Sequence, residues 1–390
     1  MNTLRYKSFV FLMLVSMLGS LPTEVKVANF SFSALITMFT TLVFFVVLLK
    51  VKISFKCLPF ILPYFLFVTF DTLGFLWGSL SISVIQNWVV WVGGFLVFVC
   101  FASIREVGRY VGAFNIIIKI SFLPYSIFMS VLMLMGKDDP ASVQLTLIFF
   151  SFFCSKFILT RSINSLIALL FLVLVPIFTA SRIVLIAELV AGGYVFLMLE
   201  KYRLAPKESP FKWILPFASF FLILGVMFFA FSSSKNMEEA NFNGDNALQV
   251  GSVNISTAGR LYWWERSFKS AMIRPFFGHG TDGSPEMLAS RQWKHPHNDY
   301  LRIFHHLGLV GLFLWAIFIL KILQVSYRGL RYTQNLSFQH VYLTGHLSIV
   351  FMSIVMFTDN TITYSYILFP CLAVLGITVS CFLNDSTLKA

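Results

Sequence analysis

Long apolar runs, separated by short polar connections, recur along almost the whole chain. A helix needs roughly 20 mostly apolar residues to cross a lipid bilayer. The pattern predicts twelve such helices, at residues 8–21, 27–49, 57–77, 84–102, 116–135, 141–159, 163–179, 183–199, 214–231, 307–325, 341–357 and 362–382. The first run lacks a good small-x-small cleavage site, so we expect it to remain as an uncleaved helix.

These runs predict an all-α polytopic membrane protein in three parts. Residues 1–231 would hold the first nine transmembrane helices, residues 232–306 one large polar loop, and residues 307–390 the last three helices. Water-soluble folds need charge on their surfaces, whereas this chain of 390 residues is 58% hydrophobic and only 12% charged. Its mean hydropathy of +0.82 agrees with a membrane class.

The large polar loop divides into two segments of different character. Residues 232–257 are rich in Ser, Asn, Gly and acidic residues, which predicts a mobile flap. Residues 259–274 carry apolar side chains at helical spacing, at Leu261, Trp264, Phe268, Ala271 and Met272. We therefore expect an amphipathic helix there, lying along the membrane surface or capping the bundle, with Thr257 as its N-cap.

The net charge of +12 would suit a nucleic-acid partner, but the distribution of the charge indicates membrane topology instead. With a cytoplasmic N-terminus, sixteen basic residues fall in the tails and inner connections and only three in the short outer connections. The three outer ones are Lys26, Lys137 and Arg182. Both termini should then face the cytoplasm, and the large loop should face outward.

Residues 293–311 concentrate the polar groups that are able to do chemistry. His297 is a candidate general base, because histidine changes charge near neutral pH. A loop histidine is, however, more often a structural or exposed group. The run His295-Pro-His297-Asn-Asp299 also offers metal-ligand types, but His-x-His alone is a weak signal. Asp299 is most simply a helix N-cap or a salt-bridge partner.

Three arginines, Arg182, Arg260 and Arg274, lie at predicted outer boundaries of the membrane. Each one alone is explained by snorkelling toward lipid headgroups. Together with the histidine they suggest a phosphate site, because a guanidinium binds phosphate oxygens bidentately and stabilises growing negative charge. Glu188 lies inside a predicted span and should face the bundle interior, as a structural partner of Arg182 or another buried donor.

The order of the loop motifs resembles that of a known family, the O-antigen ligase and Wzy-type polymerase superfamily of bacterial inner membranes. The resemblance covers roughly residues 179–311, and the twelve-span layout extends it over the whole chain. The motifs that carry it are Ser181-Arg182, Gly259-Arg260, Trp264, Pro275, Gly278-His279-Gly280, His297-Asn298, Gly308 and Gly311.

The resemblance implies a metal-independent, inverting glycosyltransferase without a cofactor, of a GT-C-like helical membrane fold. Its donor would be a glycan on undecaprenyl pyrophosphate at the periplasmic face of a Gram-negative inner membrane. Arg182 and Arg260 would hold the pyrophosphate and His297 would activate the acceptor hydroxyl, with Asn298, Trp264, Gly308 and Gly311 in support. Arg274 is added to the pyrophosphate contacts from its charge and position.

Two activities share these expectations. We predict an O-antigen ligase, whose acceptor is lipid A-core, because there is a single substantial outer loop. The alternative is a Wzy-type polymerase that joins lipid-linked repeat units. A transporter or flippase is a distant alternative, since twelve spans suit transporters equally well. Transporters, however, bind near the membrane midplane, whereas the polar residues here concentrate outside.

Overall fold

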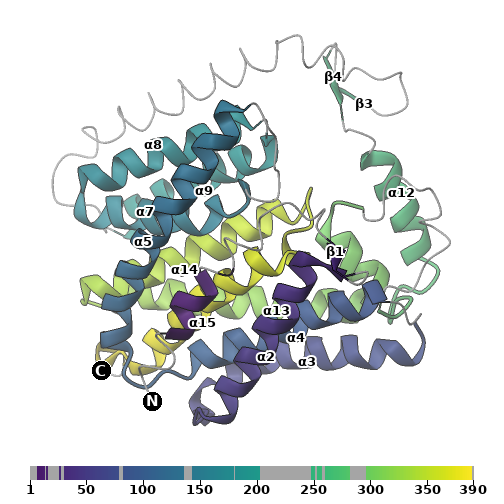
Figure 1. The fold of residues 1–390 in the computed structure, drawn as a ribbon, viewed down its shortest axis with the longest axis horizontal. Helices are drawn as coiled ribbons and strands as arrows, with labels where there is room; N and C mark the ends of the chain where they lie inside the picture. Colours follow the sequence, from purple (N-terminus) through teal and green to yellow (C-terminus); the bar gives the residue numbers. More distant parts are fainter. Residues whose placement is uncertain are drawn as a thin grey trace.

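The computed structural model describes residues 7–13, 15, 26–27, 30–78, 82–135, 143–179, 181–202, 247–250, 253–256, 260–281 and 296–388. The chain is a bundle of apolar helices (Figure 1). They are α2 (Phe32–Leu49), α3 (Leu58–Leu73), α4 (Ile82–Ala102), α5 (Val107–Leu134), α7 (Thr146–Thr160), α8 (Ile163–Phe178), α9 (Arg182–Tyr202), α13 (Asp299–Tyr332), α14 (Leu336–Val355) and α15 (Ser365–Asn384). Short 3-10 turns flank them, at η1 (Phe55–Cys57), η2 (Gly74–Leu76), η5 (Thr361–Thr363) and η6 (Ser386–Leu388).

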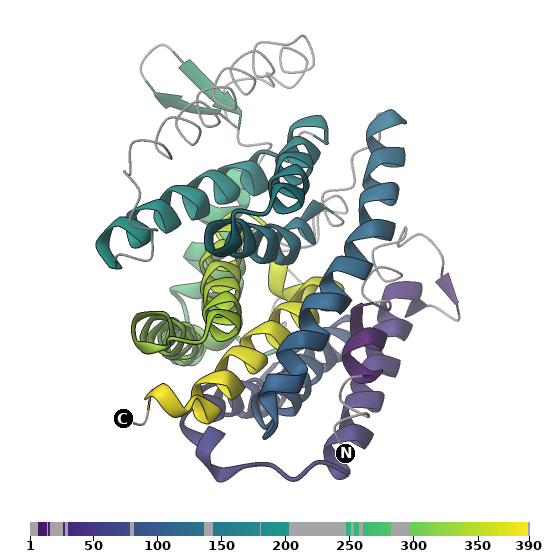
Figure 2. The ribbon, with the colours of Figure 1, turned by 90° about the vertical axis from the view of Figure 1, so that its left-hand side faces the viewer.

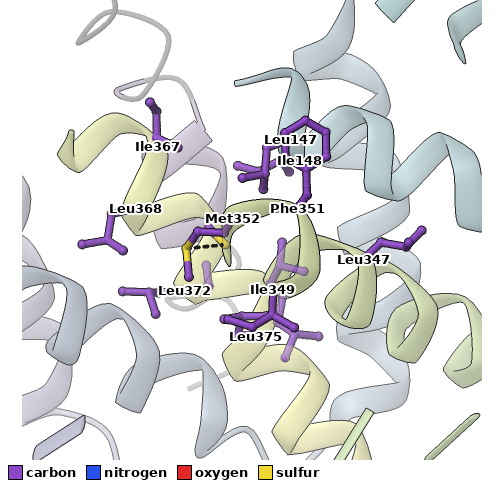
Figure 3. Packing of buried hydrophobic residues seen from close by; sticks show 14 of the residues in the cluster. Leu147, Ile148, Leu347, Ile349, Phe351, Met352, Ile367, Leu368, Leu372 and Leu375 are labelled. Carbon is purple, nitrogen blue, oxygen red and sulfur yellow. Dashed lines mark hydrogen bonds between the residues drawn. The ribbon is translucent and has the colours of Figure 1, made fainter. Parts of the chain in front are cut away.

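Helix α15 forms the centre of the bundle. Every residue from Ser365 to Cys381 is buried, and a helix that is apolar and buried all round belongs to a core. It packs against α4, α13 and α14, and Figure 2 shows it surrounded by the other helices. Figure 3 shows side chains of α7, α14 and α15 interdigitating, with the thiol of Cys371 3.7 Å from the sulfur of Met352.

The outer helices expose apolar side chains. Phe39 and Leu42 on α2, Ile120 and Leu123 on α5 and Ile163 on α8 are each more than half exposed. A water-soluble surface would not present so many large apolar groups, whereas a lipid-facing surface excludes charge. Six of the helices are long and apolar enough to cross a membrane, and four apolar helices are shorter. The chain is therefore an all-α membrane protein.

These ten helices coincide with ten of the predicted spans. The first predicted span is described only at residues 7–13 and 15, which are helical, and the predicted span 214–231 lies outside the described residues. The count of twelve therefore stays a prediction. The bounds of two helices were wrong: α5 begins at Val107 instead of residue 116, and α13 extends from Asp299 to Tyr332 instead of 307–325. The extensions contain charged residues, such as Arg109 and Arg302, so an apolar run alone does not predict them.

The described chain also has four short strands, which pair as two antiparallel hairpins. Strands β1 (Lys26–Val27) and β2 (Phe30–Ser31) precede α2. Strands β3 (Ala247–Val250) and β4 (Val253–Ser256) lie within the segment for which composition predicted a flap. The rest of residues 232–257 lies outside the described residues.

Helix α12 (Arg260–Ala271) confirms the amphipathic helix predicted for residues 259–274, apart from its ends. It lies across one end of the bundle, whereas α15 ends at the opposite end (Figure 1). Ser267 and Ala271 are buried against the bundle, whereas Phe268 and Met272 are about half exposed, so the buried face is narrower than the apolar stripe predicted. The predicted N-cap, Thr257, lies outside the described residues.

Candidate active site

Helix α13 is broken at Gly308, and a separate piece of chain fills the break. Gly308 has φ +63° and ψ −160°, which no helix contains and which glycine alone adopts without strain. Residues 275–281, which we call the inserted segment, replace the hydrogen bonds that the break removes. The amides of His279 and Gly280 donate to the carbonyls of His305 and His306, and those of Leu309 and Val310 donate to Pro275 and Phe276. All four bonds are 2.8–3.2 Å long.

The close approach of these two backbones explains the Gly-x-Gly of the inserted segment. Gly278 has φ +68°, and a Cβ atom there would overlap the carbonyl of His306. A Cβ atom on Gly308 would overlap the carbonyl of Phe276 in the same way. The glycines of the two motifs thus allow the inserted segment to join the broken helix.

The inserted segment also binds α3. The hydroxyl of Thr281 donates to the backbone carbonyl of Asp71, at 2.6 Å, and lies 3.1 Å from its carboxylate. Glycines 74 and 78 of the η2 region allow residues 280–281 to pack directly on this end of α3. One end of the bundle therefore gathers α3, α12, the inserted segment and the beginning of α13.

The break at Gly308 divides α13 into a first half, residues 299–307, and a second half, residues 309–332. His297 lies two residues before the first half. Asn298 is the N-cap of this helix, and its side chain accepts a hydrogen bond from the amide of Leu301 at 2.9 Å. The indole of Trp264 on α12 donates to the carbonyl of Pro296 at 2.7 Å. His297 itself has φ +46°, a left-handed conformation that is uncommon for a residue with a side chain. The local backbone is thus held from both sides, in a conformation often found at functional sites.

The imidazole of His297 faces the loop between α14 and α15. Its Nδ1 lies 3.5 Å from the carboxylate of Asp359 and 3.5 Å from the side-chain nitrogen, Nδ2, of Asn360. The carboxylate of Asp359 is held in turn by two hydrogen bonds. The side chain of Gln144 donates to it at 2.7 Å, and the backbone amide of Asn360 donates to it at 2.8 Å. A histidine with a carboxylate at Nδ1 is the arrangement of a general base that is oriented by its partner.

Asp299 joins the beginning of α13 to the same loop. Its amide donates to the carbonyl of Met356 at 2.8 Å, and its carboxylate accepts from the amide of Ile362 at 2.9 Å. The expectation that Asp299 would be the N-cap was wrong, because Asn298 holds that position and Asp299 is the first helical residue. Asp299 is fully buried, and its two bonds fix the positions of His297 and Asp359 relative to each other.

The three predicted arginines lie at different places. Arg260 is one turn before Trp264 on α12, which is about 6 Å along the helix. Arg274 lies three residues beyond the end of α12 and lines a groove together with Phe70 and Leu73 of α3. Arg182 begins α9, and its side chain lies outside what the structure describes.

Glu188 is buried, as the sequence predicted. It lies beside Thr146, two residues from the Gln144 that donates to Asp359. The beginning of α9 therefore belongs to the same end of the bundle as His297. Neither carboxylate oxygen of Glu188 has a hydrogen-bond partner among the described residues, so its predicted pairing with Arg182 stays a prediction.

Two apolar grooves open at this end. One, of about 610 Å³, runs between α12 and α13 next to His297. It is lined by Trp264, Glu265, Phe268, Asn298, Tyr300, Leu301, Phe304 and Leu312. The other, of about 640 Å³, lies between the end of α3 and the inserted segment and has Arg274 at its rim.

Asp359 and Gln144 are the candidate site residues that sequence reasoning missed. Asp359 and Asn360 are the polar pair of the short predicted outer connection between the last two spans. That position could have indicated Asp359 as a site residue, because a carboxylate on the same predicted side of the membrane as His297 can orient this histidine as a base. Among the described residues, no group of three or more His, Cys, Asp or Glu side chains is placed to hold a metal ion.

A helical membrane protein with a histidine, a carboxylate and an arginine-bearing helix gathered at one end of its bundle has the parts of a membrane-embedded transferase. Residues 167–316 match a family model described as O-antigen ligase, which confirms the predicted resemblance over this part of the chain. This family implies a glycosyltransferase of ligase or polymerase type. No curated protein matches the chain.

Proposed function

We propose that this protein is an O-antigen ligase, which transfers a polysaccharide from undecaprenyl pyrophosphate to lipid A-core. The observation that carries the proposal is the pairing of Asp359 with His297, which lies in the part of the chain that matches the family model. A Wzy-type polymerase would use the same site with another lipid-linked glycan as acceptor. The two activities differ in the acceptor and share the chemical step.

In the proposed step, an acceptor hydroxyl attacks the anomeric carbon of the donor sugar. The new bond joins the acceptor oxygen to that carbon, and the bond between the carbon and the pyrophosphate oxygen breaks with inversion. The hydroxyl proton passes to Nε2 of His297, because Nδ1 is turned toward Asp359. Asp359 stabilises the resulting imidazolium, as the carboxylate of a catalytic triad does. The bonding electrons leave with the lipid pyrophosphate.

Arg260 is the residue best placed to stabilise this leaving group. It lies one turn from Trp264, which binds the backbone next to His297, and its buried Nε has no hydrogen-bond partner among the described residues. Growing charge on pyrophosphate oxygens is stabilised by a fixed guanidinium. We propose that Arg182 contributes a second contact, and that Arg274 contacts an anionic lipid at the more distant groove.

The apolar groove between α12 and α13 supports a lipid-linked donor. Asn298 lies at this groove and next to His297 in the chain, so a polyprenyl chain in the groove would bring its pyrophosphate beside the histidine. We propose that this end of the bundle faces the periplasm, with both termini cytoplasmic and twelve helices in the inner membrane. The outer ends of two predicted spans, at η2 and Gln144, meet there with α12, His297 and Asp359, which lie in segments predicted to be external.

Deletion of the gene tests the proposed activity against its alternative. Without a ligase, long polymer should accumulate on the carrier lipid and lipid A-core should carry no glycan. Without a polymerase, lipid A-core should instead be capped by a single repeat unit. Gel analysis of lipopolysaccharide and of carrier-linked glycan distinguishes these outcomes, and normal lipopolysaccharide in the deletion strain would exclude both activities.

Replacing Arg260 with lysine should reduce glycan transfer by about tenfold or more, because lysine keeps the charge and loses the bidentate geometry. Transfer is measured by complementation of the deletion strain, at matched protein abundance. Arg266→Lys is the matched control, since Arg266 is an exposed arginine of the same helix, and it should transfer normally. Full activity of Arg260→Lys would remove the proposed role in pyrophosphate binding.

A further inference from the structure

Two histidines stack where the inserted segment meets the first half of α13. The rings of His279 and His305 are nearly parallel, with centroids 4.6 Å apart and an angle of 16° between their planes. The same two residues share a backbone hydrogen bond, from the amide of His279 to the carbonyl of His305 at 3.0 Å. A force between the rings therefore acts directly on a bond that joins the inserted segment to the broken helix.

Ser270 connects this pair to α12. Its carbonyl lies 2.8 Å from Nε2 of His279, so this ring nitrogen donates to it. Its hydroxyl lies 3.1 Å from Nε2 of His305 and 3.5 Å from Nε2 of His279. Trp264 of the same helix binds the backbone next to His297. Both rings thus contact the helix that reaches the candidate base.

No carboxylate contacts either ring within the described part of the chain. The ionisable groups of the surrounding elements are Arg260, Glu265, Arg266, Lys269 and Arg274 on or just beyond α12, Asp299, Arg302 and His306 on α13, and Asp71 on α3. The three carboxylates among them bind other groups, namely Lys269, the amide of Ile362 and the hydroxyl of Thr281. The imidazole of His306 lies edge-on to His305, with centroids 5.6 Å apart.

The closed junction therefore disfavours protonation of the pair. His305 is 8% exposed, whereas His279 is partly exposed and accessible to protons from solvent. A charge on a buried ring is unfavourable, and two like charges at this separation repel each other. In an open state the rings are hydrated and apart, and such histidines titrate near about pH 6.5. Because the open state then binds more protons than the closed state, acidification below about pH 6.5 favours opening.

We propose that the stacked pair His279–His305 makes this junction acid-sensitive. Near neutral pH the uncharged rings stack and the junction is closed. As the rings become charged, the inserted segment separates from the first half of α13 and Ser270 of α12 loses its contacts. An effect on glycan transfer rests on the proposed function, because α12 carries Arg260 and Trp264. The acid-sensitive opening itself does not depend on that function.

Hydrogen–deuterium exchange tests the opening, because a buried amide exchanges when its hydrogen bond breaks. The full-length protein in detergent is measured by mass spectrometry at about pH 7.5 and about pH 5.5, without substrate. Rates are corrected for the intrinsic pH dependence of exchange. In peptides that contain the amides of His279, Gly280, Leu309 and Val310, we expect corrected exchange to be about tenfold faster at the lower pH, since suppressing one protonation by about one pH unit changes the opening equilibrium by that factor.

Two glutamine variants separate the pair from other histidines. His305→Gln keeps a hydrogen-bonding group that reaches Ser270 and removes the titration, so its corrected rates should differ by less than about threefold between the two pH values. His340→Gln is the matched control. It removes a buried histidine of α14, whose Nε2 lies 3.2 Å from the carbonyl of Phe152, and it should keep the full response.

Peptides of α15 report global unfolding and should not respond to pH. If His305→Gln does not fold, His279→Gln decides the question, because it removes the like-charged neighbour and should also reduce the response. An undiminished response in either folded variant, or a response of α15 as large as that of the junction, would overturn the proposal. So would equal corrected exchange of the wild-type junction at both pH values. Failure of the proposed transferase activity is a separate result, because no substrate enters the measurement.

Discussion

Replacing His297 with alanine is expected to reduce glycan transfer by at least about a hundredfold, because general-base catalysis typically contributes 10²–10⁴-fold. The side chain is one-quarter exposed, so the variant should insert and accumulate normally. Transfer is measured by complementation of the deletion strain, with the amount of protein in the membrane determined in the same cells.

The control for this experiment is His306→Ala. His306 contributes its backbone carbonyl to the bond with the inserted segment, and alanine keeps that carbonyl. Transfer by His306→Ala should remain near the wild-type rate. In the same assay Asp359→Asn should lose much of the activity, since an amide does not stabilise an imidazolium as a carboxylate does. Normal transfer by His297→Ala at normal abundance would eliminate the general-base mechanism.

The apolar pattern predicted the bundle well because a membrane span is a local property of sequence. Ten predicted spans coincide with helices, although the pattern did not predict how far α5 and α13 extend. The first half of α13 contains Asp299, Arg302 and His305, which do not resemble a span. All three are buried by contacts with distant parts of the chain, so tertiary structure makes this polar segment a core helix.

The candidate site was predictable only where its residues share one stretch of chain. His297, Asn298 and Trp264 all lie in the large loop and do come together, through Pro296 and the cap of α13. Asp359 is 62 residues from His297 and was missed, because no local pattern records which loops meet. The structure also separates Arg260, which lies on α12, from Arg274, which lies beyond the end of α12 at the groove beside α3, a distinction that charge alone could not make.

The glycine motifs did mark the region of the candidate site, but they do so because two backbones approach closely there. In the sequence, Gly278 and Gly280 belong to the motifs that carry the family resemblance, and Gly308 and Gly311 were assigned a supporting role. In the structure, Gly278, Gly280 and Gly308 have positive φ and lie where the inserted segment meets the broken helix. The site therefore depends on a backbone junction, and its most sensitive positions need not carry a side chain.

Gly308→Ala should consequently destabilise the protein strongly and reduce glycan transfer. Alanine at φ +63° and ψ −160° is strained, and its Cβ would overlap the carbonyl of Phe276. Strain and overlap together should cost on the order of 3 kcal/mol in the free energy of unfolding. Either the four bonds to the inserted segment break or the helix shifts, and both displace His297.

The measurement that checks this expectation combines abundance, thermal stability in detergent and glycan transfer. Gly112→Ala is the matched control, because Gly112 is an exposed helical glycine of α5 and a Cβ atom there meets nothing within 4 Å. It should be neutral or slightly stabilising, since alanine favours helix. If Gly308→Ala matched this control in stability and transfer, the inserted segment would not hold the two halves of α13 together, and another contact would have to position His297.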